Sequence, residues 1–123
     1  MGEQAKDRLG KAGETHAARY LKRRGLKLVE RNYHAAGAEI DLIATDRGTL
    51  VFVEVKTRKT DRWGPPGEAV NTAKRRHIVR AARQYIAVRR VGHLPCRFDV
   101  VEVVMTDGKP QINHIADAFT AES

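Results

Sequence analysis

The central part of the chain carries two carboxylates whose spacing suits metal-assisted chemistry. Residues 39–45 and 49–58 are predicted to form two strands joined by a tight turn at 46–48. If two residues make that turn, Asp41 lies opposite Glu54 on one face of the hairpin. A three-residue turn would shift the pairing by one residue and would need a bulge to restore it.

Two carboxylates that face each other on a sheet, about 5 Å apart, repel each other. A divalent cation between them removes the repulsion, and ligands that offer only oxygen suit Mg²⁺ or Mn²⁺. Lys56 shares the face of Glu54 and is predicted to lie opposite Glu39, so its ammonium group is placed to orient or deprotonate water or to stabilise charge on a phosphate. Asp41 and Glu54 as metal ligands, with Lys56, therefore predict phosphodiester hydrolysis. The alternative is a salt-bridge ladder on a solvated face.

Glu14 is a further candidate for the same site. It lies on the helical stripe that contains Ala17, Ala18 and Leu21, where a carboxylate is costly unless it is paired or used. We therefore expect Glu14 either to reach the carboxylates of the sheet or to pair with Arg31 at an ordinary helix edge.

The chain is strongly basic, and the excess charge is concentrated. Lys and Arg number 23 and Asp and Glu 15, which gives +8, and residues 69–98 contain eight basic residues and no acid. A polyanion is therefore the expected partner, with DNA favoured over RNA, although a basic surface kept for solubility is the alternative. Four arginines share one face of the helix expected at 68–91. The residues expected to contact nucleic acid are Arg58, Lys74, Arg75, Arg76, Arg80, Arg83 and Arg90.

The elements that must position these residues follow the order α-β-β-β-α-β-β. A strand, a crossover helix and another strand imply one parallel pair, so the predicted fold is α/β, a mixed β-sheet flanked by helices. The helices are expected at 2–25 and 68–91, and the strands at 26–33, 39–45, 49–58, 97–105 and 111–115, with a flexible tail at the end.

Length and composition exclude several classes of protein. The 123 residues suit a single domain, 1–123, and one cysteine, Cys96, excludes a disulfide framework or a Cys-rich zinc site. No apolar run approaches a membrane span and no signal peptide begins the chain, so a cytoplasmic protein without a membrane partner is expected. Trp63, in a Gly- and Pro-rich loop, is interpreted as a base-stacking residue or a loop anchor.

Several motifs resemble the YraN-like family of bacterial proteins. They are Gly13-Glu14, Glu39-Ile40-Asp41-Leu42, Val51-Phe52-Val53-Glu54-Val55-Lys56 and Arg97-Phe98-Asp99. That family is similar to restriction endonucleases and archaeal Holliday-junction resolvases. The resemblance implies a restriction-endonuclease-like PD-(D/E)xK core with catalytic Asp41, Glu54 and Lys56, and Glu14 at the position of the first-helix glutamate. Ile40 stands where the wider superfamily often has proline, and Ala38 where the family pattern usually has glycine.

Three functions from different classes follow. The first is a Mg²⁺- or Mn²⁺-dependent endonuclease that cuts DNA, with branched or flapped structures as candidate substrates. The second is a non-catalytic nucleic-acid-binding protein that keeps the nuclease scaffold. The third is a protein-interaction module whose basic helix meets an acidic partner. The resemblance to resolvases also leaves a homodimer open.

Overall fold

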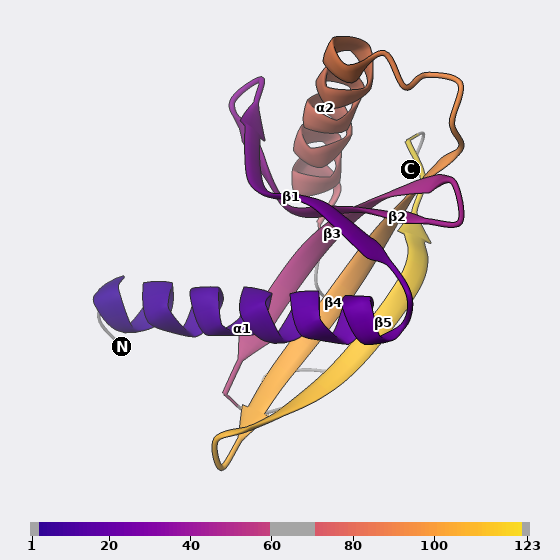
Figure 1. Cartoon of the computed structure of the whole chain (residues 1–123). Coiled ribbons are helices and arrows are strands. Elements are labelled where there is room, and N and C mark those ends of the chain that lie inside the picture. The colour runs from indigo at the N-terminus through magenta and orange to yellow at the C-terminus, as the bar shows by residue number, and fades with distance from the viewer. Residues whose placement is uncertain (1–2, 60–70, 122–123) are drawn as a thin grey trace.

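The computed structural model describes residues 3–59 and 71–121, and these form two helices and one five-stranded sheet (Figure 1). This confirms the predicted α/β class and the order of its elements. The elements are α1 (Glu3–Arg23), β1 (Lys27–Ala35), β2 (Ala38–Asp46), β3 (Thr49–Arg58), α2 (Thr72–Arg89), β4 (Cys96–Thr106) and β5 (Lys109–Phe119). Within the described residues, no helix is both long and apolar enough to cross a membrane.

The strands lie in the order β1-β2-β3-β4-β5, and the sheet is mixed. Neighbouring strands are antiparallel except for β3 and β4, which run parallel because α2 lies between them in the chain. The turn between β2 and β3 has two residues, Arg47 at φ 51° and Gly48 at φ 88°. This turn pairs Leu42 with Val53, which confirms the two-residue turn and rules out the shifted register.

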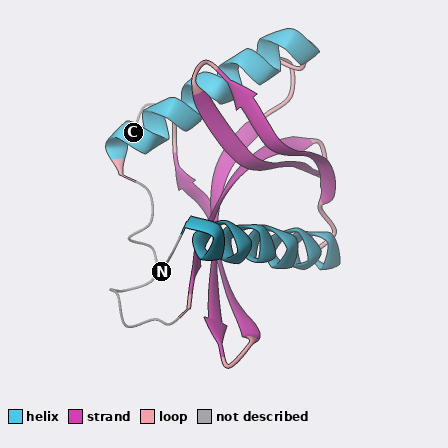
Figure 2. Cartoon of the chain, turned by 90° about the vertical axis from the view of Figure 1, so that its left-hand side faces the viewer, coloured by secondary structure: helices cyan, strands magenta, loops and turns pink. Residues whose placement is uncertain are grey.

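The two helices cover opposite faces of the sheet (Figure 2). Helix α1 buries Ala17 and Leu21 against one face, where Val53 of β3 points toward it. Helix α2 buries Tyr85 against the other face, where Phe52 of β3 meets the tyrosine ring edge-on at 5.9 Å. The alternation along β3 thus supplies both cores, as expected for a central strand with two covered faces.

Several element boundaries differ from the prediction, and two of the differences have a clear physical reason. Helix α2 begins at Thr72 because the side chain of Asn71 accepts a hydrogen bond from the backbone N–H of Lys74 at 2.9 Å, which caps the helix. Strand β5 extends to Phe119, beyond the predicted end at Ile115, because the Phe119 ring stacks on Phe98 with 5.0 Å between ring centroids. The predicted first residues of this helix, 68–70, and Trp63 lie outside the described residues, as do the last two residues of the predicted tail.

Candidate active site

Asp41 lies where β2 bends away from β3. Ile40 packs in the core beneath α2 and Leu42 in the core beneath α1, although residues two apart in a regular strand share one face. The pairing of β2 with β3 ends at Leu42, and the Asp41 carboxylate then accepts the backbone N–H of Val55 at 2.8 Å. The side chain of Asp41 therefore replaces a ladder hydrogen bond and points into the gap between the strands, beside Glu54.

The same bend changes the place of Glu39. The prediction that Glu39 lies opposite Lys56 is wrong, because the β2–β3 pairing stops before either residue. Glu39 instead pairs with His34 on β1 and accepts a hydrogen bond from Asn32 Nδ2 at 2.7 Å. Sequence reasoning gave Glu39 no role at the site, since the twist that redirects it depends on packing against α2.

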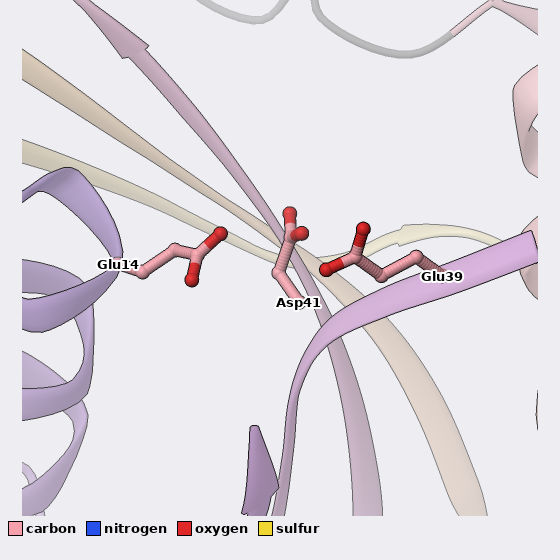
Figure 3. Close-up of side chains that lie close together, drawn as sticks. All are labelled: Glu14, Glu39 and Asp41. Carbon is pink, nitrogen blue, oxygen red and sulfur yellow. The ribbon is translucent and has the colours of Figure 1, made fainter. Parts of the chain in front are cut away.

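Glu14 reaches this group from α1, as one of the two interpretations expected. Asn32 Nδ2 donates to Glu14 Oε1 at 3.1 Å as well as to Glu39, while Arg31 donates to Thr15. One carboxylate oxygen from each of Glu14, Glu39 and Asp41 lies within 4.8 Å of the others (Figure 3). Three acidic side chains, one from α1 and two from β2, thus converge on one point.

Gly13 allows α1 to come this close to the sheet. A Cβ atom at Gly13 would lie 1.8 Å from Oγ1 of Thr57, a residue of β3 next to Lys56. The backbone of Gly13 is therefore in direct contact with the side chain of Thr57. This close approach of α1 to β3 places the next residue, Glu14, at the site.

We expect Gly13→Ala to lower the free energy of unfolding by about 1–3 kcal/mol, because the added methyl group overpacks this contact and pushes α1 from β3. Gly10→Ala is the matched control, since nothing lies within 4 Å of a Cβ there and alanine favours the helix by about 1 kcal/mol. Urea unfolding of both variants measures the difference. Equal stabilities would contradict the close contact.

Glu54 is buried, with 3% of its surface exposed, and it pairs with a lysine that was predicted to contact nucleic acid. Lys74 Nζ lies 2.5 Å from Glu54 Oε1. The charge and hydrogen bond of Glu54 raise the pKa of Lys74, although burial acts in the opposite direction. Burial, reinforced by the ammonium group of Lys74, lowers the pKa of Lys56. The two lysines of the site, Lys56 and Lys74, thus have pKa values shifted in opposite directions.

The Asp41 carboxyl has a strongly raised pKa. Burial, followed by the charge of Glu54, raises its pKa from 3.8 to about 8, although the hydrogen bond from Val55 lowers it. No lysine or arginine forms an ion pair with Glu14 or Asp41 among the described residues. The donors of the acidic cluster are all carboxylate oxygens, which fit Mg²⁺ or Mn²⁺.

The predicted metal ligands are therefore close together but differently oriented. Asp41 groups with Glu14 and Glu39, whereas Glu54 is engaged by Lys74. The cluster opens into a cleft of about 550 Å³. It is lined by Leu9, Gly10, Glu14, Asp41, Glu54, Val55, Lys56, Thr57, Arg58, Lys59 and Lys74. A second hollow of about 440 Å³ shares Asp41, Glu54 and Lys74 and extends toward His77. Two open spaces thus meet at the acidic residues, with room for an extended substrate.

The chain matches a family model over most of its length. The model described as "Uncharacterised protein family UPF0102" matches residues 13–103, a segment that includes the whole acidic cluster and Lys56. The chain belongs to the UPF0102 family. This confirms the YraN-like resemblance inferred from the motifs.

Relatives in the UPF0102 family are similar over nearly their full length. A UPF0102 protein of Symbiobacterium thermophilum is 50% identical over 115 residues, which cover 93% of this chain and 98% of the relative. One from Geobacter metallireducens is 45% identical over 111 residues, 90% of this chain and 91% of the relative. The crystal structure of SSO0001 aligns with 93% of the chain and 53% of its own, at 16% identity and a TM-score of 0.36.

The seven basic residues predicted to contact nucleic acid do not form one continuous surface. Arg76, Arg80 and Arg83 are exposed on α2, on the side that faces away from the sheet, and line a hollow of about 220 Å³; we call them the arginine face. Arg75 lies over the ring of Phe119, and Arg58 pairs with the buried Glu102 at 3.7 Å. The exposed Arg90 adopts a left-handed conformation that ends α2, and Lys74 has joined the acidic cluster.

Proposed function

We propose that this UPF0102 protein is a divalent-metal-dependent nuclease that hydrolyses phosphodiester bonds in DNA. The observation that carries the proposal is the convergence of Glu14, Glu39 and Asp41 oxygens within 4.8 Å, beside a buried Glu54. A cluster of this kind is unfavourable without a cation. A cleft with two lysines beside it supplies the positive charge that a phosphate substrate requires.

Asp41 and Glu54 would hold the metal, with Glu14 and Glu39 completing the set of oxygen donors. When bound, Mg²⁺ or Mn²⁺ lowers the pKa of coordinated water and stabilises negative charge on the phosphoryl oxygens. The hydrogen bond from Val55 fixes the orientation of Asp41, and Asn32 fixes one oxygen of each glutamate. The protein thus presents its ligands in a defined arrangement.

Lys56 is suited to move the proton. Its lowered pKa increases the fraction of neutral amine, which accepts a proton from the attacking water. The water oxygen forms a bond to phosphorus as the bond to the leaving sugar oxygen breaks, and that oxygen takes up a proton from solvent. Lys74 holds Glu54 in place and contributes positive charge beside the same cleft.

The experiment that tests this function is an incubation of the purified chain with labelled nucleic acids. Duplex, single-stranded, flapped and branched DNA, with matched RNA, are treated with Mn²⁺, Mg²⁺ or EDTA. We expect metal-dependent cleavage of at least one DNA structure. Tight binding without cleavage under every condition would instead support the non-catalytic nucleic-acid-binding protein.

The arginine face is proposed to contact the phosphate backbone. We expect the logarithm of the DNA affinity to fall steeply with the logarithm of salt concentration, and the double variant Arg76→Gln/Arg80→Gln to reduce the slope by about 1–2, because each lost phosphate contact removes about 0.9. Arg19→Gln/Lys109→Gln removes the same charge elsewhere and serves as the control. Fluorescence anisotropy at several salt concentrations measures both, and an unchanged slope would count against the arginine face.

A further inference from the structure

A second ionic cluster lies on the face of the sheet that α1 covers, around the fully buried side chain of Asp99. Its carboxylate accepts hydrogen bonds from Arg97 Nε at 3.0 Å, from His114 Nε2 at 2.7 Å and from the backbone N–H of Asp117 at 3.0 Å. Arg97 also pairs with Asp46 at 3.1 Å. None of these groups belongs to the acidic cluster.

An ionised carboxylate is unusual in the buried part of a β-strand. Asp99 lies between the buried Phe98 and Val100 of β4, and apolar residues in place of a buried ionic network are often as stable or more so. Although burial raises the pKa of Asp99, the hydrogen bonds from His114 and Arg97 lower it overall, so the carboxylate is ionised. A charged group is therefore retained here at a cost in desolvation.

Outward from Asp99, the cluster opens into a cavity of about 480 Å³. Arg24 of α1 and Arg47 of the β2–β3 turn line it together with Arg97 and Asp46. Arg97 pairs with both Asp46 and Asp99, whereas Arg24 and Arg47 are exposed and pair with no acidic side chain among residues 8–59 and 71–121, so three arginines face two carboxylates. The lining therefore carries a surplus of positive charge.

His114 connects the buried carboxylate to the cavity. Because Asp99 is ionised and only accepts, His114 Nε2 carries the proton of their hydrogen bond. The ring is held edge-on against Tyr20, with 5.5 Å between centroids. No described side chain forms a hydrogen bond with Nδ1 of His114. That ring nitrogen is therefore available to a ligand or to water in the cavity.

We propose that this cavity, the Arg24/Arg47/His114 pocket, binds one phosphate group of a nucleic-acid strand. The two arginines supply the charge, and the His114 ring, whose Nε2 donates to Asp99, donates from Nδ1 to a phosphate oxygen when the ring is the imidazolium ion. Tyr20 follows Glu14 by six residues on α1, about 9 Å along the helix axis, or two to three nucleotides along a strand. This assignment rests on the nucleic-acid substrate of the proposed function and gives that substrate a second anchor along α1.

DNA binding in EDTA tests the pocket without any cleavage. Arg24→Gln/Arg47→Gly is the variant, since glycine suits the left-handed φ of 51° at position 47 and neither residue is buried. We expect a loss of affinity of about tenfold and a reduction of the salt slope by about 1, because one phosphate contact is removed. Arg19→Gln/Lys109→Gln removes the same charge outside the pocket and is expected to cost less than threefold. Equal losses in the two double variants would overturn the proposal.

Nuclear magnetic resonance of the His114 ring provides an independent measurement. Titration with inorganic phosphate is expected to shift the His114 ring signals in the unmodified chain but not in Arg24→Gln/Arg47→Gly. A shift with phosphate but no loss of DNA affinity in that variant would overturn the nucleic-acid source, and no shift would overturn the phosphate site. Oligonucleotides with and without a 5′-phosphate distinguish two sources of the phosphate group. If Arg24→Gln/Arg47→Gly loses the same affinity for both oligonucleotides, the pocket binds a backbone phosphate. If it loses affinity only for the phosphorylated oligonucleotide, the pocket binds the 5′ terminus. Absence of cleavage with this binding intact would refute only the nuclease.

Discussion

Asp41→Asn is expected to slow metal-dependent DNA cleavage at least a thousandfold. The amide keeps the shape of the side chain and can still accept the Val55 N–H, but it removes the charge that a divalent cation requires from this ligand. Because the change is nearly isosteric, DNA binding in EDTA should remain within a few-fold of the unmodified protein. Single-turnover cleavage in Mn²⁺ and anisotropy in EDTA separate the two effects.

Asp107→Asn is the matched control for this experiment. Asp107 lies exposed in the β4–β5 turn with φ 51°, a conformation that asparagine also adopts readily. The substitution removes the same charge from a turn that is distant in sequence from the acidic cluster. The cleavage rate of Asp107→Asn should therefore equal that of the unmodified protein. Cleavage that survives in Asp41→Asn would overturn the assignment of Asp41 as a ligand, whatever the control shows.

Without metal, the same Asp41→Asn substitution is expected to stabilise the fold. The folded chain holds a proton on Asp41 up to about pH 8, whereas the unfolded chain releases it near 3.8. Between these values the unfolded state binds fewer protons, so the free energy of unfolding falls as pH rises. Asparagine does not titrate, so we expect Asp41→Asn to flatten this decline and to be more stable at pH 8 by about 1–3 kcal/mol.

Urea unfolding between pH 4 and 9 in EDTA measures this difference, again with Asp107→Asn as the control. Addition of Mn²⁺ should stabilise the unmodified chain and reduce the gain of Asp41→Asn, because a ligand that binds only the folded state raises its stability. Parallel stability curves for the unmodified chain and Asp41→Asn would show that Asp41 carries no raised pKa.

The hairpin of the site could be predicted because its geometry is local. Arg47-Gly48 allows a two-residue or a three-residue turn, and the two-residue turn that forms determines that Leu42 meets Val53. The expected pairing of Asp41 opposite Glu54 does not form, because the β2–β3 ladder ends at Leu42, where β2 bends. Asp41 comes to lie beside Glu54 through the hydrogen bond that it accepts from the Val55 N–H.

The remaining features of the site depend on contacts between distant segments. Glu39 turns toward Glu14 because Tyr33 and Ile40 pack beneath α2, which bends the outer half of the β1–β2 hairpin. Lys74 is one of several basic residues in its segment, and only the start of α2 after Asn71 decides that it meets Glu54. A sequence pattern specifies the face of an element but not which other element covers it.

Asn32 has a consequence for the order in which the protein is built. One amide from β1, on a residue with φ 52°, gives its two hydrogens to carboxylates on α1 and β2. The separation of those acids is thus a property of three segments together, and no fragment that lacks one of them has the same spacing. Because α1, β1 and β2 follow one another in the chain, residues 3–46 already contain every group that sets the separation of Glu14 and Glu39.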